Sequence, residues 1–222
     1  MVAIRSKPLL IALGFALVSV FANDASANLL PNGNFDAGNT GFTSGYTYSP
    51  GNIVAAGTYD VVGNPYASHD GAASFTDHTS GTGLMLAVNG SGDVSQVVWS
   101  ELVSVIPGAT YQFAGWATSW GLATAIGRDP NPAAFHISIN GIDLGPFIQL
   151  SGIDGQWQEF SFLWDSAASA TARIELRLDT VAWYGNDPAF DDFRFSTVPE
   201  PGTLALLSFG LAGLAFTRRR KP

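Results

Sequence analysis

The sequence predicts an all-β protein, an antiparallel β-sandwich for which a jelly roll is the form that fits the length. Apolar and polar residues alternate over 135–139 and 173–179, as in strands that bury one face. Turn-forming pairs such as Asn140-Gly141 separate the apolar runs. Between the two ends of the chain, no stretch has the apolar spacing of an amphipathic helix. Short strands with Gly-rich connections favour a sandwich.

The N-terminus has the features of a secretory signal peptide. A short basic segment, residues 1–7, precedes an unbroken apolar stretch, residues 9–22. Ala25-Ser26-Ala27 then supplies the small-residue pattern that signal peptidase accepts. We therefore expect signal peptidase to remove residues 1–27, so that an exported chain begins at Asn28.

Residues 28–197 are predicted to form one β-sandwich domain. These 170 residues are enough for one packed core. Within them, the Gly-, Ser-, Thr- and Asp-rich stretch 32–80 is expected to form long loops. Besides the two alternating stretches, strands are expected at residues 84–88, 94–106, 111–116, 158–164 and 190–195.

The charge of this domain limits its partners. Residues 28–197 contain sixteen Asp and Glu residues, four Arg and no Lys, a net charge of −12. Such a charge disfavours nucleic acid or an anionic lipid surface as a partner, and it favours cations. The chain has no Cys, which excludes thiolate chemistry and thiolate metal sites.

The C-terminus combines three elements within residues 198–222. Pro199-Glu200-Pro201 precedes an apolar stretch, about 202–217, and a basic tail at 218–221. Sixteen helical residues span ~24 Å, somewhat less than the ~30 Å of a hydrocarbon core. The basic tail would hold its end in the cytoplasm, while a signal peptide exports the preceding domain. Both flanks therefore favour a membrane helix.

This arrangement resembles the PEP-CTERM sorting signal of Gram-negative bacteria. The motif is Pro199, Glu200 and Pro201, and the terminal cluster includes Arg218, Arg219 and Arg220. The resemblance implies recognition by an exosortase, with the C-terminal helix in the membrane before processing. It also implies delivery to the cell surface or to an exopolysaccharide matrix.

Two segments near the ends of the domain resemble the first and last strands of galactose-binding-like jelly rolls, the fold of many carbohydrate-binding modules. The first is residues 28–36, which contain Asn32-Gly33-Asn34-Phe35-Asp36, with Asp where the family more often has Glu. The second is residues 185–195, which contain Asp191-Asp192-Phe193. The resemblance implies a structural Ca²⁺ ion held by Asp36 and Asp191, with Asp187 or Asp192 and loop carbonyls completing the shell. Clustered Asp residues suit the oxygen-rich coordination of Ca²⁺. As an alternative, Asp192 pairs with Arg194 and Asp187 only caps a turn.

Aromatic residues are the candidates for sugar recognition, because exposed rings stack on the C–H faces of sugars. Trp99 and Trp164 share strand parity with apolar neighbours and should point inward. The expected carbohydrate-binding residues have the opposite parity or lie in a loop, and they are Trp116, Trp120, Trp183 and Tyr184. The segment Asp77-His78-Thr79, before a Gly-rich turn, is interpreted as a structural loop.

No catalytic constellation is recognisable, so we expect a protein without enzymatic activity. The domain has three Glu residues, all within predicted strands, and no Gly-x-Ser-x-Gly motif. Its His residues lack the spacing of zinc ligands. Two functions remain open: a carbohydrate-binding protein retained in exopolysaccharide, or a structural or adhesion protein of the matrix with a protein partner. If all four candidate aromatic residues are buried, the second function is favoured.

Overall fold

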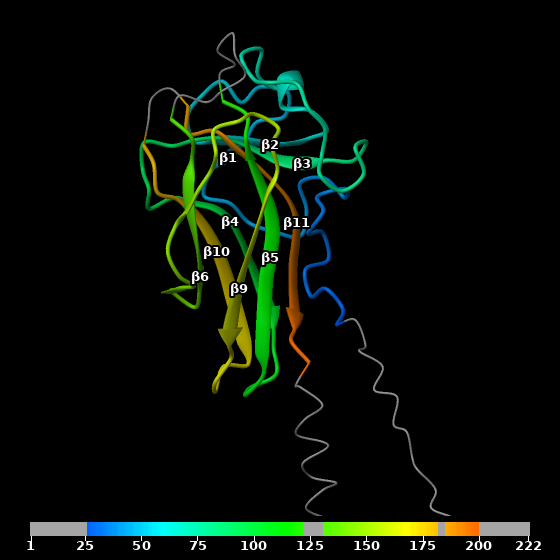
Figure 1. Ribbon diagram of the computed structural model, residues 1–222, viewed down its shortest axis with the longest axis vertical. Helices are drawn as coiled ribbons and strands as arrows, with labels where there is room; N and C mark the ends of the chain where they lie inside the picture. Colours follow the sequence, from blue (N-terminus) through cyan, green and yellow to red (C-terminus); the bar gives the residue numbers. More distant parts are fainter. Residues whose placement is uncertain (1–25, 122–130, 182–184, 200–222) are drawn as a thin grey trace, which may run out of the picture. The chain divides into compact units, whose positions relative to one another are not determined.

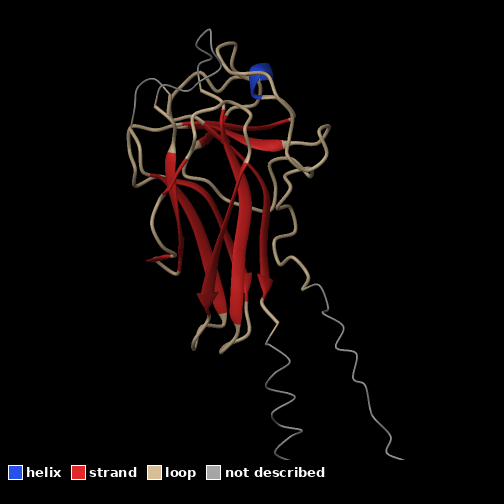
Figure 2. Cartoon of the chain, in the orientation of Figure 1, coloured by secondary structure: helices blue, strands red, loops and turns tan. Residues whose placement is uncertain are grey.

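The computed structural model describes residues 26–121, 131–181 and 185–199. Ser26–Pro199 forms one compact unit, and its two sheets confirm the predicted all-β sandwich (Figures 1 and 2). The expected signal peptide and the apolar stretch near the C-terminus lie outside the described residues. Within the described residues, no helix has the length and apolar character needed to cross a membrane.

The larger sheet has six strands in the order β1-β2-β3-β11-β5-β9. The smaller sheet has the order β4-β10-β6-β7, and β8 also pairs with β6. All strand pairs are antiparallel except β1 and β2, which run parallel. The strands are β1 Thr47–Tyr48, β2 Thr58–Val62, β3 Met85–Asn89, β4 Val97–Ser104, β5 Thr110–Ser119, β6 Ala134–Ile139, β7 Ile142–Asp143, β8 Ile148–Gln149, β9 Gln158–Asp165, β10 Thr171–Leu178 and β11 Pro188–Thr197.

The main core lies between the two sheets and is rich in aromatic side chains. Trp99 and Trp164 are buried there, as their parity predicts. Phe193 lies near the centre, and its ring is 5.0 to 6.1 Å from the rings of Phe35, Trp99, Phe113, Phe160 and Phe190. Aromatic pairs in this range add about 0.5–1.5 kcal/mol each beyond the burial of apolar area.

A β-bulge interrupts β11. Asp191 pairs with Trp116 and Arg194 pairs with Ala114, so β11 contains one more residue than β5 between these pairs. Asp192 adopts the left-handed conformation, with φ of 53°, which Asp tolerates better than most residues. Because of the extra residue, Asp191 and Arg194 both point away from the core while Phe193 remains inside it.

The N-terminal segment of the described chain lies along β11 beyond the bulge. Leu29 N–H donates to the Phe195 carbonyl at 2.8 Å, and Phe193 N–H donates to the Gly33 carbonyl at 2.8 Å. A Cβ atom on Gly33 would lie 1.8 Å from the Phe193 carbonyl oxygen. Only glycine therefore allows the two backbones to approach this closely.

A second, smaller core covers part of the outer face of the six-stranded sheet. It contains Trp120, Ile53 and Met85 with neighbouring alanines. The covering residues come from the stretch 32–80, which was expected to form long loops. This expectation is wrong at the short strand β1, at β2 and at one short 3₁₀ helix, Pro65–Ala67. Local composition concealed the β2 segment, because its five residues stand between Gly-rich runs.

One carboxyl group of the fold points toward the interior. Glu101 on β4 pairs with the buried Ile174 of β10 and therefore shares its face of the sheet. Because β4 is an edge strand, the side chain remains half-buried rather than enclosed. Burial raises the pKa of Glu101 to about 7, since desolvation disfavours the charged form.

We expect Gly33→Ala to lower the free energy of unfolding by about 2–4 kcal/mol, because the added methyl group forces the N-terminal segment away from β11. Urea denaturation of the full chain in detergent measures this change. Gly92→Ala is the matched control, since a Cβ atom at Gly92 meets nothing within 4 Å. Equal stability of the two variants would contradict this account of Gly33.

We expect Glu101→Gln to stabilise the protein at pH 8 by about 1–2 kcal/mol and to have little effect at pH 4. The value at pH 8 is reduced for solvent screening, because the Glu101 side chain is half-exposed. The folded pKa of Glu101 lies above its unfolded value, so the folded state loses stability as pH rises between about 4.5 and 7. Thermal unfolding between pH 4 and 8 tests this. Asp70→Asn, at a side chain that is 97% exposed, should keep the wild-type pH dependence.

Candidate functional site

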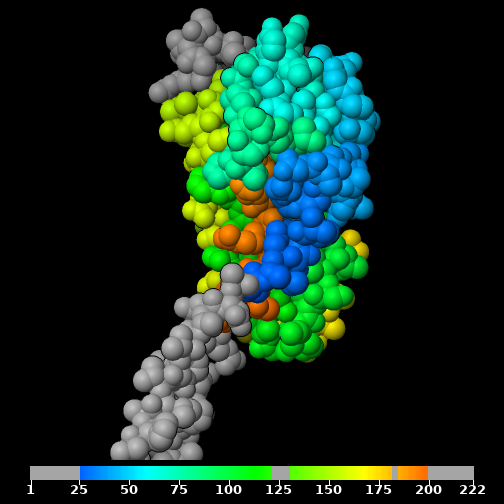
Figure 3. Space-filling model, turned by 90° about the vertical axis from the view of Figure 1, so that its right-hand side faces the viewer, coloured from blue at the N-terminus to red at the C-terminus, as the bar shows by residue number. Residues whose placement is uncertain are grey.

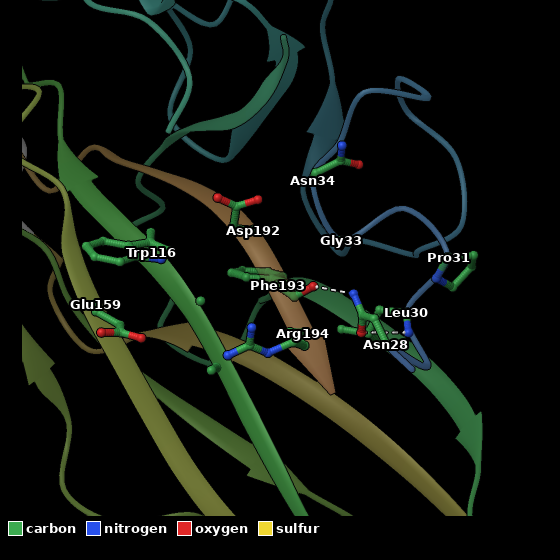
Figure 4. A pocket seen from close by; sticks show the side chains of 12 residues that line it. Asn28, Leu30, Pro31, Gly33, Asn34, Trp116, Glu159, Asp192, Phe193 and Arg194 are labelled. Carbon is green, nitrogen blue, oxygen red and sulfur yellow. Dashed lines mark hydrogen bonds between the residues drawn. The ribbon is translucent and has the colours of Figure 1, made fainter. Parts of the chain in front are cut away.

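A groove of about 600 Å³ lies on the outer face of the six-stranded sheet, between the N-terminal segment and strands β5, β9 and β11. Figure 3 shows the N-terminal segment, in blue, beside β11, in orange. The groove is lined by Asn28, Leu30, Pro31, Gly33, Asn34, Ala114, Gly115, Trp116, Glu159, Asp192, Phe193 and Arg194 (Figure 4).

Strand register brings three side chains of different chemistry to this groove. Trp116 on β5 lies opposite Asp191 on one side and Glu159 on the other. Arg194 follows the bulge on β11 and is exposed. Within the described part of the chain, the Arg194 guanidinium has no hydrogen-bond or ion-pair partner. The groove therefore offers an aromatic ring, a carboxylate acceptor and a guanidinium donor.

The loop 77–84 is held against the bulge by two adjacent carboxylates. Asp191 is fully buried and accepts hydrogen bonds from His78 N–H at 2.9 Å and Thr79 N–H at 3.1 Å. Asp192 lies within 2.7 Å of both His78 Nδ1 and Thr79 Oγ1. Burial raises the pKa of Asp191 to about 6 despite these N–H donors. The alternative pairing of Asp192 with Arg194 is therefore wrong, because loop residues occupy Asp192.

The same loop turns around a third carboxylate and meets a fourth. Asp77 accepts hydrogen bonds from Ser80 N–H at 2.7 Å and Gly83 N–H at 2.9 Å. Asp36 accepts one from Leu84 N–H at 2.9 Å. A Cβ atom on Gly83 would lie 2.3 Å from Asp36 Oδ1 and 3.1 Å from Asp77 Oδ2. The glycine thus lets two carboxylates approach one turn.

His78 connects the loop to the groove. Its imidazole stacks on the Trp116 indole, with ring centroids 4.0 Å apart and planes 18° apart. Trp157 contacts the same imidazole edge-on, at 5.7 Å. One face of Trp116 is therefore covered, and the indole is held in a fixed orientation at the margin of the groove.

The four residues expected to bind carbohydrate have different positions. Trp116 is half-buried and lines the groove. Trp120 is fully buried in the second core, and its indole N–H donates to the Pro188 carbonyl at 2.9 Å. The prediction that Trp120 is exposed is therefore wrong. The side chain does lie on the outer face of the sheet, as its strand parity predicts, but the preceding loops cover it. Trp183 and Tyr184 lie outside the described residues.

The expected calcium ligands do not form one group. Asp36, Asp191 and Asp192 all contact the loop 77–84, whereas Asp187 accepts a hydrogen bond from Gly90 N–H at 3.0 Å. Asp187 also precedes Asp191 by four residues in extended chain, a span of about 13 Å. Over residues 26–121, 131–181 and 185–199, no three His, Cys, Asp or Glu side chains are grouped so that they could hold a metal ion.

Sequence reasoning missed two polar side chains of the groove. Glu159 was interpreted only as a strand residue, and Arg194 only as a possible partner of Asp192. Their joint position depends on the register of β5, β9 and β11 and on the bulge. The only local signal was the pair Asp191-Asp192, because an Asp residue can adopt the left-handed conformation of such a bulge.

Comparisons with known proteins identify the C-terminal signal and the fold. The family model of the PEP-CTERM protein-sorting motif matches residues 197–221. The chain therefore has the sorting motif of an exported protein that an exosortase processes. The comparison with curated proteins found no match.

Two solved structures illustrate the fold. The CBM22-1 xylan-binding domain of Paenibacillus barcinonensis Xyn10C is 14% identical, with a TM-score of 0.52, over 81% of this chain and 100% of that domain. The Stig cyclase Fisc from Fischerella sp. TAU is 11% identical, with a TM-score of 0.50, over 80% of this chain and 100% of the cyclase. The sandwich is thus similar to that of a carbohydrate-binding module, and the same architecture also occurs in an enzyme.

We expect His78→Ala to destabilise the protein by about 1–2 kcal/mol, since it removes a hydrogen bond to Asp192 and leaves one face of Trp116 uncovered. Urea denaturation measures the loss, and acrylamide quenching of Trp fluorescence should increase. His136→Ala removes a similar His–Asp pair, with Asp179 at 2.8 Å, and should leave quenching unchanged. Equal quenching of both variants would contradict the proposed cover over Trp116.

Proposed function

We propose that this exported protein is a non-catalytic glycan-binding protein, and that the groove on the six-stranded sheet takes a neutral, hydroxyl-rich chain. The observation that carries the proposal is the combination in one groove of a fixed, half-buried indole, Trp116, with the donor Arg194 and the acceptor Glu159. An apolar ring flanked by a few convergent polar groups is the usual composition of a sugar site.

Each part of the groove suits a different part of a sugar. The indole can pack against C–H groups, which desolvates both surfaces. Sugar hydroxyl groups both donate and accept hydrogen bonds, so they can pair with the Arg194 guanidinium and the Glu159 carboxylate together. At the opposite wall, the Asn34 side-chain carbonyl adds a further acceptor, whereas the Asn28 amide is bonded to the backbone of Leu30, Phe193 and Phe195.

Charge supports a neutral glycan rather than an acidic one. Two carboxylates, Glu159 and Asp192, line the groove with a single cation, Arg194. The net charge of −12 over residues 28–197 adds repulsion toward a polyanion. Among extracellular polysaccharides, neutral chains therefore suit this groove best, and retention in exopolysaccharide agrees with sorting to the cell surface.

Binding without catalysis is supported by the state of the acidic residues. A general acid for glycoside hydrolysis needs burial or a neighbouring charge that keeps it protonated. Of the two carboxylates that line the groove, Glu159 lies exposed on β9, and Asp192 is occupied by His78 and Thr79. Asp191, whose pKa burial raises, is fully buried and does not line the groove. A matrix protein with a protein partner is the second candidate. Trp116, which alone among the candidate aromatic residues that the structure describes lines the groove, favours the first.

We expect Trp116→Ala to weaken binding of xylohexaose or cellohexaose at the groove by at least tenfold, because stacking on the indole is lost. Isothermal titration calorimetry of the full chain in detergent measures this change. Leu163→Ala, at a residue 64% exposed on β9 and outside the groove, is the control and should bind as the wild type does. Undiminished binding by Trp116→Ala would refute the site.

The calcium ion that the resemblance implies is a separate proposal. Asp36, Asp191 and Asp192 all contact the loop 77–84 but are not grouped as metal ligands in the described structure, so they would have to converge beside that loop to hold the ion. These carboxylates now accept bonds from N–H and O–H groups of that loop, so an ion would have to replace some of those donors. Support comes from the burial of Asp191, whose charged form a cation would stabilise.

We expect Ca²⁺ at 100 times its Kd to stabilise the protein by about 2.7 kcal/mol against unfolding, relative to chelator. Thermal unfolding with Ca²⁺ or with EDTA measures this difference. Asp36→Ala should abolish the effect, whereas Asp187→Ala should retain it, because Asp187 is bonded at Gly90 instead. Identical midpoints with Ca²⁺ and with EDTA would reject the ion.

A further inference from the structure

A second cleft, of about 420 Å³, lies beside β4, the edge strand of the other sheet. One wall is the segment 41–43, whose Thr43 forms a β-bridge to Ser100. The other walls come from β4 and β10. The cleft is lined by Gly41, Phe42, Thr43, Ser100, Glu101, Leu102 and Arg173.

Three polar side chains in this lining have no partner among the residues that the structure describes. Ser100 is only 4% exposed, and its buried Oγ atom makes no hydrogen bond. The Glu101 carboxyl group has no hydrogen-bond or ion-pair partner there, and neither has the Arg173 guanidinium. The Ser100 Oγ atom is enclosed and cannot meet a ligand, but the Glu101 carboxyl group is half-buried at the cleft. Because partly buried charged groups are nearly always paired, an unpaired carboxyl group beside a guanidinium group points to a molecule that binds there.

Apolar surface completes the cleft. Leu102 lies opposite Arg173 in the sheet and is 55% exposed. Phe42 is partly buried against the main core. The cleft thus combines an apolar surface with a guanidinium donor and a carboxyl group, and it shares these two polar groups with the first groove.

We infer that this cleft is a second carbohydrate subsite, which takes one neutral sugar unit, and that a single domain can therefore link two glycan chains. Arg173 donates to a sugar hydroxyl from the outer face of the sheet, and the Glu101 carboxyl group, which borders the cleft from the core-facing side of the edge strand, pairs with a neighbouring hydroxyl. Leu102 packs against the C–H face of the ring. The inference rests on the proposed function, because it assigns the same ligand class to both sites.

The positions of the two sites favour linking over extended binding of one short chain. The first groove lies on β5, β9 and β11 of the six-stranded sheet, and the cleft lies on β4 and β10 of the other sheet. The packed core separates the two sheets. A hexasaccharide at one site therefore leaves the other free, and a long polysaccharide engages two protein molecules or two chains.

Calorimetric stoichiometry tests the inference, using the full chain in detergent with xylohexaose and cellohexaose. The wild type should bind two molecules of one of these probes per chain. Arg173→Ala and Leu102→Asp both alter the cleft, so each variant should bind one molecule per chain, at the first groove. Trp116→Ala should also bind one molecule per chain, at the cleft. Arg177→Ala is the control, because Arg177 pairs with Glu175 at 2.9 Å on the same strand and lies outside the cleft. It should still bind two.

Linking itself is measured by the turbidity of the protein mixed with soluble xylan or glucan, which Arg173→Ala and Trp116→Ala should each abolish. One bound hexasaccharide that Trp116→Ala removes and Arg173→Ala does not affect would overturn the second subsite and leave the proposed function intact. Binding of neither probe by the wild type would overturn the proposed function and the inference with it.

Discussion

The β-bulge in β11 is the feature on which the rest of the structure depends. One extra residue, Asp192, changes the direction of the strand without moving Phe193 out of the core. Two consecutive carboxylates then face the loop 77–84, and the strand beyond the bulge is free to pair with the N-terminal segment. The bulge thus joins the loop 77–84 to β11, more than 100 residues later in the sequence. The acceptors are the carboxylates of Asp191 and Asp192, and hydrogen bonds to charged groups are stronger than those between neutral groups.

The groove follows from the same geometry. The N-terminal segment forms one wall because it pairs with β11, and Gly33 permits the close approach. The loop 77–84 places His78 on Trp116, so the indole loses rotational freedom before any ligand arrives. A preformed aromatic surface lowers the entropic cost of binding. The stability of the bulge and the order of the candidate site are therefore two results of one set of contacts.

Strand positions and core residues were predictable from the sequence because they depend on local alternation, as in 173–179 and 158–164. The direction of Trp120 was predictable too, since its parity is that of Trp116, but its burial was not. What covers a sheet face depends on segments distant in the sequence, here the residues around Ile53 and Ala72. The pairing of the loop 77–84 with Asp191 is equally non-local, and no short motif encodes it.

Surface charge explains how an acidic domain can favour uncharged chains. With a net charge of −12 over residues 28–197, general electrostatic attraction cannot concentrate a polyanion at its surface. Recognition must then come from short-range contacts: an indole, exposed leucine surface and single guanidinium groups that no carboxylate of the described chain neutralises. Such contacts are individually weak. In the proposed function, a protein with one such site on each sheet gains strength from simultaneous engagement rather than from either site alone, because the second contact forms at high effective concentration.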